Sequence, residues 1–425
     1  MNYSREIIKT NNIYLDVLII FIFAVLIRVI LFYLFDFQRD LHGGDSSYYL
    51  EIGHNILQYG VHGDKWIGSF YRPPLYSLFA GLVAKTSETA IFFYVIQSAL
   101  FIGVSFVVFF FYFKYNSNLA FYSSLLIAFS PFDALLNGRV LGENLATPFI
   151  LISALSFISS KYSIWSFMLS GVTLGCAVLC RDIFILLPLL YVLVCMFMKI
   201  KIKYISFYLL GFFLLVVPWA YRNSQMPNGG VFLSKGIMWQ NLWVGTWMRN
   251  TDFMFKPGYL PPEALQTYDE GKSPAIVMEA YRNNDQSFFK QATLQYVAKH
   301  PIKVIETWII RYPRLWFGTR SDLISTNLIK GSLIWYSIKI FFYLLSALIV
   351  LLGASGMFIS LQSKQISVLF TLPVIYSALI YIPFYNVETR YTQPVMPILS
   401  IYAVLCISYI LKNKSSLLRF NIFNK

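Results

Sequence analysis

Charged residues are scarce in this sequence. Only 13% of its 425 residues are Asp, Glu, Lys or Arg, whereas 57% are hydrophobic; soluble domains have about 25% charged residues. The chain has four cysteines, Cys176, Cys180, Cys195 and Cys406, and each lies in an apolar segment without a histidine or acidic partner. This spacing argues against a metal site or disulfide. The composition excludes an ordinary soluble domain and predicts an all-α polytopic membrane protein.

Several catalytic and nucleotide-binding signatures are also missing. The sequence has no glycine-rich phosphate loop, no H-E-x-x-H, no paired C-x-x-C and no G-x-S-x-G. Its four histidines, His42, His54, His62 and His300, lack the spacing of metal ligands. The net charge of +14 is explained by basic cytoplasmic loops, so we expect no nucleic-acid partner.

About ten apolar segments are predicted to cross the bilayer. They are residues 13–35, 89–113, 118–132, 144–160, 163–180, 182–198, 204–221, 333–360, 366–385 and 391–411. The apolar segment 72–84 is short for a span, and we interpret it as re-entrant or interfacial. A tilted eleventh span is the alternative for that segment.

The distribution of basic residues predicts the orientation. With the N-terminus in the cytoplasm, Lys199, Lys201 and Lys203 fall in an inside loop, and the inside loops hold almost no acids. We therefore expect a multi-pass protein of the cell (inner) membrane with both termini cytoplasmic and residues 13–35 as an uncleaved anchor. Most acids and several arginines then lie outside, which predicts an extracytoplasmic active site.

The chain divides into three predicted regions. Residues 1–221 form an N-terminal transmembrane catalytic module, 222–332 an extracytoplasmic or interfacial loop region, and 333–425 the C-terminal transmembrane helices. In the middle region Trp239, Trp243 and Trp247 are spaced by four, and packing at the membrane interface is favoured over sugar stacking for this aromatic face. Further along, two helices are predicted on either side of Pro301, the second one amphipathic.

Two acids outside the predicted spans are candidates for chemistry. Asp45 opens the stretch "DSSYYLEIGHNILQYG", where it fits a structural N-cap worth about 1 kcal/mol. It equally fits a general base whose basicity rises near a partly dry surface. Glu143 lies four residues after Arg139, and the two side chains could pair on one helix face.

Arginines accompany these acids. Arg72 precedes Pro73 and Pro74, which hold the chain extended and fix the position of the guanidinium. Arg28 lies inside the first span, where it either snorkels to the headgroups or faces a lipid phosphate. Single arginines at the outer ends of spans are common, but several converging on one pocket would form an anion site; Arg181, Arg222 and Arg390 occupy such positions.

The order of several segments carries a family resemblance. These segments are "GDSSYYLEIGHNIL", "YRPPLYSLFAGL", "AFSPFDALLNGRVLGENLATPFIL", "GVTLGCAVLCRDIFILLPLL", "VVPWAYRN", "AKHPIKVIETWIIRYPRLWF" and "ETRYTQPVMPILSIYA". From Asp45 to about residue 402, the chain resembles the C-type (GT-C) integral-membrane glycosyltransferases. Within that superfamily it is similar to the family that includes protein O-mannosyltransferases and the lipid A aminoarabinose transferase (family 39-like).

The resemblance implies an activity and a set of site residues. It implies transfer of a sugar from a polyprenyl-phosphate donor in the membrane to a lipid, glycan or protein acceptor, by direct displacement with inversion. By this resemblance Asp45 is the catalytic carboxylate and Glu143 the acid of the second outer loop. The substrate-binding candidates are Arg72 near the donor phosphate, Arg390 in the R-Y-x-x-P-x-x-P signature, and Tyr48, Tyr49, Tyr76, Arg139, Arg181 and Arg28.

The sequence departs from the family at one position. Many relatives carry adjacent acids in the first outer loop, whereas Ser46 follows Asp45 here. This leaves open whether a divalent cation is bound, and whether Glu51 takes over part of the role of Asp45. No other cofactor is expected.

Two other functions remain open on the sequence. A polysaccharide polymerase or O-antigen ligase is also polytopic and rich in outer arginines, but it would not depend chiefly on an acid in the first outer loop. A lipid-linked sugar flippase or transporter usually has repeated halves and charges near the bilayer midplane, and the sequence has little of either.

Overall fold

The computed structural model describes residues 12–37, 41, 44–63, 72–159, 163–226, 230–234, 236–248, 276–277, 279–280, 283, 285–317, 332–362, 368–384 and 388–412. Every element assigned in these ranges is a helix. The elements are α1 (Ile13–Leu34), α3 (Asp45–Tyr59), α4 (Pro74–Thr86), α5 (Ala90–Phe113), α6 (Ser117–Ala128), α7 (Pro131–Leu136), α8 (Gly142–Ser159), α9 (Ile164–Cys180), η1 (Asp182–Leu186), α10 (Leu187–Phe197), α11 (Ile202–Ser224), α12 (Met238–Trp247), α15 (Gln286–Lys299), α16 (Pro301–Arg311), α17 (Pro313–Trp316), α18 (Leu333–Gln362), α19 (Val368–Ile380), η3 (Thr389–Val395) and α20 (Met396–Lys412).

The ten predicted spans coincide with helical segments of this fold, which confirms the all-α architecture. Five helical segments are long and apolar enough to cross a membrane: α1, α5, α11, α18 and the continuous η3–α20 segment. Shorter apolar helices occupy the other five predicted spans, namely α6, α8, α9, η1 with α10, and α19. It remains a prediction that each of these ten segments crosses the bilayer completely.

The exposed surface of the first helix, α1, is as apolar as its buried surface. One stripe of α1, including Ala24 and Leu31, is buried against the rest of the bundle. The other faces carry equally apolar side chains, and Phe21 and Leu26 are 48% exposed. A helix that is apolar all round is stable on a protein surface only where that surface faces lipid. The exposed apolar faces therefore mark the lipid-facing side of α1.

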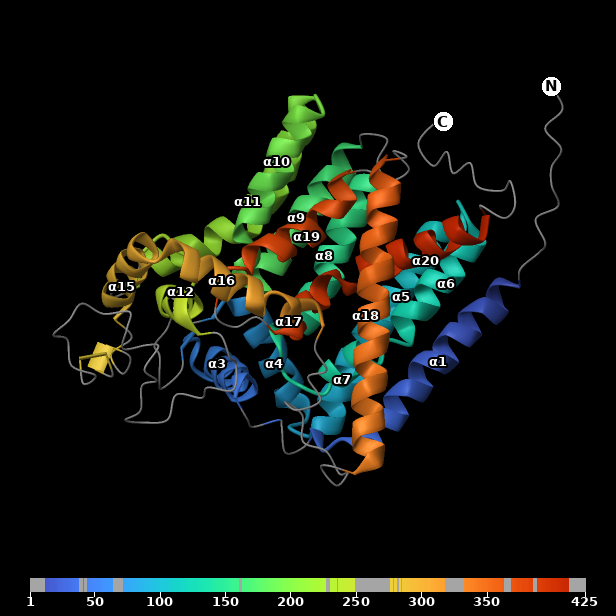
Figure 1. The fold of residues 1–425 in the computed structure, drawn as a ribbon, viewed down its shortest axis with the longest axis horizontal. Coiled ribbons are helices and arrows are strands. Elements are labelled where there is room, and N and C mark those ends of the chain that lie inside the picture. Colours follow the sequence, from blue (N-terminus) through green and yellow to red (C-terminus); the bar gives the residue numbers. More distant parts are fainter. Residues whose placement is uncertain are drawn as a thin grey trace.

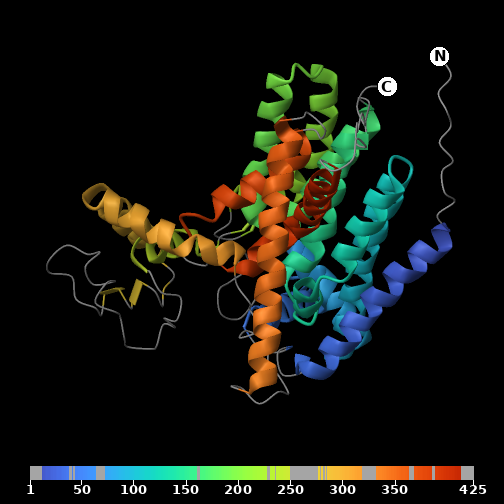
Figure 2. The ribbon, with the colours of Figure 1, turned by 45° about the vertical axis from the view of Figure 1, so that its right-hand side comes forward.

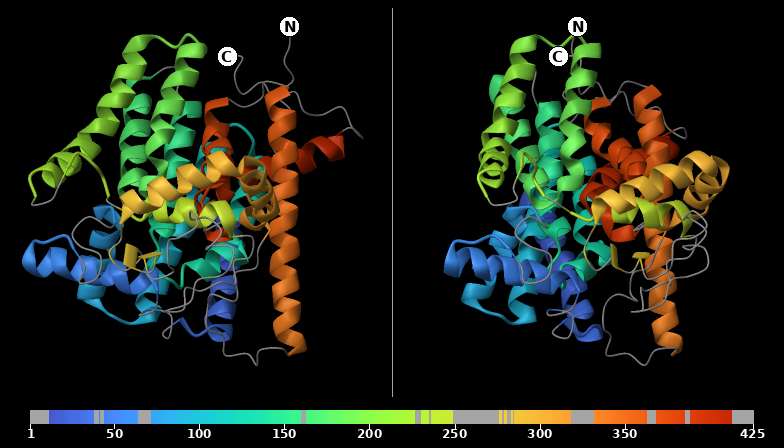
Figure 3. Two further views of the ribbon diagram at one scale, coloured as in Figure 1. Left: turned by 60° about the vertical axis from the view of Figure 1, so that its left-hand side comes forward. Right: turned by 90° about the vertical axis from the view of Figure 1, so that its left-hand side faces the viewer.

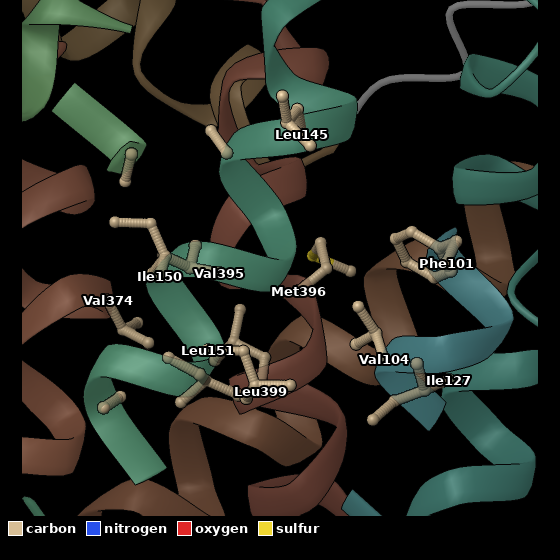
Figure 4. Packing of buried hydrophobic residues seen from close by; sticks show 14 of the residues in the cluster. Phe101, Val104, Ile127, Leu145, Ile150, Leu151, Val374, Val395, Met396 and Leu399 are labelled. Atoms are coloured by element: carbon tan, nitrogen blue, oxygen red, sulfur yellow. The ribbon is translucent and has the colours of Figure 1, made fainter. Parts of the chain in front are cut away.

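The centre of the bundle is built around α8 and the η3–α20 segment. Leu145, Ile150 and Leu151 of α8 pack among Val395, Met396 and Leu399, and Phe101, Val104, Ile127 and Val374 close the same core from α5, α6 and α19 (Figure 4). α8 contacts both α9 and η3, and α20 packs along α18. This core holds the start of α8 and the start of η3 in a fixed relation.

The α3–α4 pair lies at the opposite end of the bundle from the α10–α11 turn (Figure 3). The two helices run parallel, because Tyr49 meets Tyr76 near their N-termini and Gly53 meets Gly81 one turn further on. α4 has 13 residues, and its length of about 20 Å is short of the ~30 Å hydrocarbon layer. The re-entrant or interfacial interpretation of this segment, with a tilted eleventh span as its alternative, stays a prediction.

We predict that Gly53→Ala separates α3 from α4. A Cβ at Gly53 would lie 2.3 Å from the carbonyl oxygen of Ser77 and 2.6 Å from the amide nitrogen of Gly81. Both are backbone atoms, so the helices themselves must move, at a cost of about 1–3 kcal/mol. Thermal unfolding of the purified protein in detergent should show a lower midpoint.

Gly103→Ala is the matched control for this substitution. Gly103 lies within α5, and a Cβ there would meet no atom within 4 Å. Because alanine is the better helix former by about 1 kcal/mol, Gly103→Ala should leave the midpoint unchanged or raise it. Equal midpoints for the two variants would contradict the close contact of α3 and α4.

A second, smaller core lies beside the bundle. Helices α12, α15 and α16 group together at one side of the molecule (Figures 1 and 2). Trp243 and Trp247 are buried there against Phe289, and the Arg311 guanidinium donates to the Gly245 carbonyl at 2.7 Å. The expectation that the tryptophan face packs at the membrane interface is therefore wrong for Trp243 and Trp247. The break at Pro301 is confirmed, since α15 ends at Lys299 and α16 begins at that proline.

Candidate active site

Five charged side chains singled out in the sequence meet at helix ends on one side of the bundle. They are Asp45, the first residue of α3; Arg72, two residues before α4; Glu143, in the first turn of α8; Arg181, between α9 and η1; and Arg390, in η3. The acids stand at helix N-termini and Arg181 follows a helix C-terminus. The helix macrodipoles favour these charges at these ends.

Asp45 is bound by two arginines. Its Oδ1 lies 2.7 Å from Nη2 of Arg72, and its Oδ2 lies 2.8 Å from Nη1 of Arg390. The interpretation of Asp45 as an N-cap is wrong. Gly44 occupies the N-cap position with a φ of 54°, a conformation that favours glycine, and the cap has no side-chain hydrogen bond. The Asp45 carboxylate is thus turned toward the arginines and away from the backbone of its own helix.

Glu143 is the most deeply buried acid of the group. Its side chain is 1% exposed, and its Oε1 lies 3.1 Å from Nη1 of Arg181 and 3.9 Å from Nε of Arg390. The expected pairing with Arg139 along one helix face is wrong, because α8 begins at Gly142 and Arg139 precedes it in a turn. The partners of Glu143 come from distant parts of the chain instead.

Arg390 joins the two acids and adds a third. Its Nε lies 3.0 Å from Oε2 of Glu388, so one guanidinium faces Asp45, Glu143 and Glu388. Glu388 was missed as a candidate in the sequence. The only signal there is its position two residues before Arg390 in the segment "NVETR".

Tyrosine rings hold the guanidinium groups in place. The Arg72 guanidinium lies over the Tyr49 ring at 5.0 Å, and those of Arg181 and Arg390 lie over the Tyr391 ring at 5.2 and 5.1 Å. Such contacts stabilise arginine by about 0.5–2 kcal/mol and fix its plane. Tyr49 was a sequence candidate, whereas Tyr391 was not singled out although it follows Arg390 directly.

The arginines make the Asp45 carboxyl more acidic. Its burial raises the pKa, but the charges of Arg72, Arg390 and Arg181 outweigh burial and hold the pKa of Asp45 well below its usual range. The expectation that the basicity of Asp45 rises at a dry surface is therefore wrong for this arrangement of side chains. Asp45 can act as a base at ordinary pH only after the arginine side chains have moved away from its carboxylate.

Comparisons with known proteins bear on this arrangement. Neither a protein-family model nor a curated protein sequence matches the chain. Among solved structures, it is similar to the archaeal oligosaccharyltransferase AglB from Archaeoglobus fulgidus in complex with an inhibitory peptide and a dolichol-phosphate. The TM-score is 0.53 at 15% identity, and the match covers 94% of this chain and 51% of AglB. The apo form of the Archaeoglobus fulgidus oligosaccharyltransferase matches with a TM-score of 0.54 at 12% identity, covering 96% of this chain and 51% of that chain.

The chain has the GT-C membrane fold. It spans about half the length of the oligosaccharyltransferase structures that it matches. ArnT from Cupriavidus metallidurans bound to undecaprenyl phosphate matches with a TM-score of 0.38 at 15% identity, over 91% of this chain and 77% of that chain. The oligosaccharyltransferase matches confirm the resemblance to GT-C proteins seen in the sequence, as a likeness of fold.

Within the GT-C fold, Arg28 lies away from the charged cluster. It is 4% exposed, and its Nη1 donates to the carbonyls of Ala24 at 2.9 Å and Ala128 at 3.0 Å. Ala128 is the last residue of α6, where a cation stabilises the free carbonyls of the helix end. The guanidinium is turned into the bundle, so the snorkelling interpretation is wrong. A role for Arg28 in lipid-phosphate binding stays a prediction.

The other predicted binding residues are distributed unevenly. Tyr76 is fully buried and donates its hydroxyl proton to Gln97 at 2.7 Å, so it faces the protein interior. Tyr48 is half-buried on α3 beside Tyr49.

Nη2 of Arg139 lies 3.6 Å from where a Cβ of Gly44 would stand, close to Asp45. Arg222 is stacked over Trp219 at 4.8 Å, and no ion pair with a described residue places it in the cluster.

Glu51 points into a different space from Asp45. It lines a cavity of about 610 Å³ between α3 and α4, together with His54, Lys85 and Glu88. Asp45 is six residues away on the same helix and does not line that cavity. The structure therefore gives no support to Glu51 as a substitute for Asp45.

The charged cluster does not fit a divalent cation as it is arranged. In the described part of the chain, no group of three or more His, Cys, Asp and Glu side chains could hold a metal. The Arg390 guanidinium contacts both Asp45 and Glu143, so a cation already neutralises the oxygens that would bind a metal. His42 lies outside the described residues.

Proposed function

We propose that this chain is a membrane glycosyltransferase that takes a sugar from a polyprenyl-phosphate donor and passes it to an acceptor hydroxyl. One observation carries the proposal: Asp45, a candidate base, is in direct contact with Arg72 and Arg390, which can hold a phosphate. The GT-C fold supports this function, because AglB has been solved with a dolichol-phosphate. The acceptor is a lipid, a glycan or a protein.

The proposed reaction is a single displacement with inversion. The acceptor oxygen attacks the anomeric carbon while Asp45 takes the proton of the hydroxyl. The bond between that carbon and the phosphate oxygen breaks, and its electron pair leaves with the lipid phosphate. Arg72, Arg390 and Arg181 stabilise the charge that develops on the phosphate. Because a phosphate leaves readily, holding its charge matters more than protonating it.

Binding of the donor also prepares the base. In this structure both oxygens of Asp45 are held by guanidinium groups, which makes it a weak base. A donor phosphate competes for Arg72 and Arg390, and any hydrogen bond that moves to the phosphate leaves an Asp45 oxygen free. The pKa of Asp45 then rises toward its usual range. Asp45 thus becomes competent only when a donor is in place.

We place the proposed reaction on the extracytoplasmic side of the membrane. The positive-inside pattern puts both termini in the cytoplasm and the charged cluster outside, in a cell (inner) membrane. The donor lipid lies in the bilayer and its sugar reaches the cluster. In this proposal, residues 1–221 form the catalytic module, 222–332 select the acceptor, and 333–425 supply Glu388 and Arg390.

A transfer assay tests the proposed function. The purified chain in lipid nanodiscs is incubated with labelled polyprenyl-phosphate sugars and a panel of lipid, glycan and protein acceptors. We expect label to move to an acceptor from at least one polyprenyl-phosphate sugar and from no nucleotide sugar. Failure with every donor would contradict the proposal. Movement of the labelled lipid across liposomes without transfer would instead indicate a flippase.

A further inference from the structure

Three buried amide side chains form a continuous chain of hydrogen bonds behind the charged cluster. They are Gln97 of α5, Asn144 of α8 and Gln393 of η3, each at most 2% exposed. Asn144 Nδ2 donates to Gln97 Oε1 at 2.9 Å, and Gln393 Nε2 donates to Asn144 Oδ1 at 3.0 Å. Three helical elements that are far apart in the sequence are thereby tied to one another.

Neighbouring groups fix the direction of each amide. Gln97 Nε2 donates to the backbone carbonyls of Asn137 at 2.9 Å and Arg139 at 3.0 Å, which leaves Gln97 Oε1 as the acceptor. That oxygen accepts from the Tyr76 hydroxyl at 2.7 Å as well as from Asn144. Carbonyl groups cannot donate, so no amide can turn over without leaving buried groups unsatisfied. Gln393 Oε1 accepts no hydrogen bond from the described residues, but turning this amide over would place its oxygen against Asn144 Oδ1, so the arrangement shown is the one that keeps every link of the chain.

Members of this network lie next to residues of the ion-pair cluster. Asn144 directly follows Glu143, and Gln393 is three residues after Arg390, one turn along the 3-10 helix η3. Tyr76 packs edge-on against Tyr49, the ring that lies under the Arg72 guanidinium. Every segment that carries Asp45, Arg72, Glu143 or Arg390 is therefore connected to the network, directly or through one ring.

The polar character of these positions has a physical reason. Apolar side chains of similar volume would fill the same space but would tolerate small shifts of η3 along α8. Hydrogen bonds to fixed partners in a buried setting lose most of their strength when geometry changes. The amides thus specify the position of η3 relative to α8, which packing alone leaves less well defined.

We infer that Gln97, Asn144 and Gln393 are positioning residues that set the distances among Asp45, Glu143 and Arg390. This inference rests on the proposed glycosyl transfer for its effect on rate, although the placement of η3 can be measured without it. None of the three amides belongs to the ion pairs of the cluster, so their effect on chemistry is exerted through η3 and the start of α8.

The test compares Gln393→Met, Asn144→Leu and the double variant with wild type. These substitutions approximate the shape of the side chains and remove the amide link. We expect kcat to fall by about 10- to 100-fold, because a 1 Å misplacement of catalytic groups has an effect of this size. The double variant should be no slower than Asn144→Leu, because both changes break the same link. Amide hydrogen exchange measured by mass spectrometry should accelerate in residues 389–395.

Thr371→Val provides the matched control. It removes the buried hydrogen bond between Thr371 and the Tyr402 hydroxyl, 2.7 Å long, which joins α19 to α20 away from the cluster. Its kcat and the exchange of η3 should remain within about twofold of wild type. The inference is overturned if Gln393→Met and Thr371→Val have equal kcat, or if exchange in η3 is unchanged in Gln393→Met. Should wild type transfer no sugar, the proposed function fails, and the exchange experiment alone decides the positioning role.

Discussion

Asp45→Asn is expected to lower glycosyl transfer by roughly 10²–10⁴-fold, the usual contribution of a positioned general base. Asparagine keeps the shape of the side chain but cannot take the proton of the acceptor hydroxyl. It also loses the charge that faces Arg72 and Arg390 at 2.7 and 2.8 Å, so these arginines become freer to bind the donor phosphate. We therefore expect kcat to fall while donor binding is kept or strengthened. Single-turnover transfer and equilibrium binding of a polyprenyl phosphate measure the two effects separately.

Glu51→Gln is the control for this variant. Glu51 lies on the same helix as Asp45 but lines the cavity between α3 and α4. Its replacement should leave kcat within about twofold of wild type. If Glu51→Gln is inactive and Asp45→Asn is active, the assignment of the base is wrong and the role passes to Glu51.

The pH dependence provides a second check on Asp45. Its pKa in this structure lies well below the usual range because Arg72 and Arg390 face it. Since kcat/KM reports the free enzyme, it should show no loss due to Asp45 as the pH falls from 7 to about 5. Removing one cation in Arg72→Met raises the pKa of Asp45, so the acid limb should move to higher pH in that variant. A limb at the same pH in both proteins would contradict the role of Arg72.

Arg390→Met is expected to impair both transfer and stability. The guanidinium faces three carboxylates, and its loss leaves Glu143, which is 1% exposed, with Arg181 as its remaining ion-pair partner. Breaking a buried ion pair by removing one member lowers the free energy of unfolding by about 3–5 kcal/mol. The loss should be smaller here, because Asp45 and Glu388 are partly exposed to solvent. Loss of a group that stabilises the leaving phosphate should lower kcat by about 10²–10³-fold. The unfolding midpoint and kcat of the folded fraction should both fall.

Two further variants make this result specific. Arg390→Lys keeps the charge but lacks the planar fork that reaches several carboxylates at once, so its kcat should lie between wild type and Arg390→Met. Arg222→Met removes an outer arginine that is stacked on Trp219, without changing an ion pair of the cluster. It should stay close to wild type in both measurements. An equal loss in Arg222→Met would show that the effect follows net charge and not the cluster.

The helices of this protein could be predicted well from sequence for a simple reason. A helix that crosses the hydrocarbon core of a bilayer must be long and apolar, and a run of consecutive apolar residues can be recognised without knowing the tertiary structure. The helices therefore begin and end close to the predicted limits, as for α5 (Ala90–Phe113) and α9 (Ile164–Cys180). Trp243 and Trp247 show where local patterns fail, because their burial against Phe289 depends on a helix some 40 residues away.

Most charged members of the candidate site were predictable from the sequence, but Glu388, Tyr391 and the connections among the members were not. Asp45, Arg72, Glu143, Arg181 and Arg390 stand out as charges at the ends of apolar segments, and the structure brings all five together. Their pairing could not be read from spacing. Arg390 meets Asp45 across 345 positions of the chain, and the same long-range packing joins Gln393 to Asn144. Local spacing suggested an N-cap for Asp45 and an Arg139–Glu143 pair, and tertiary contacts override both.

The balance of charge in the cluster has a consequence for which anions can bind. Among the described residues, three carboxylates face three guanidinium groups, so these charges balance one another and offer little attraction to a freely diffusing anion. A phosphate anchored in the bilayer by its own tail is confined beside the cluster at an effective concentration that a solute in bulk water does not reach. For the proposed polyprenyl-phosphate donor, confinement of this kind lets a weakly attracting site remain selective for a membrane-bound phosphate over a dissolved one.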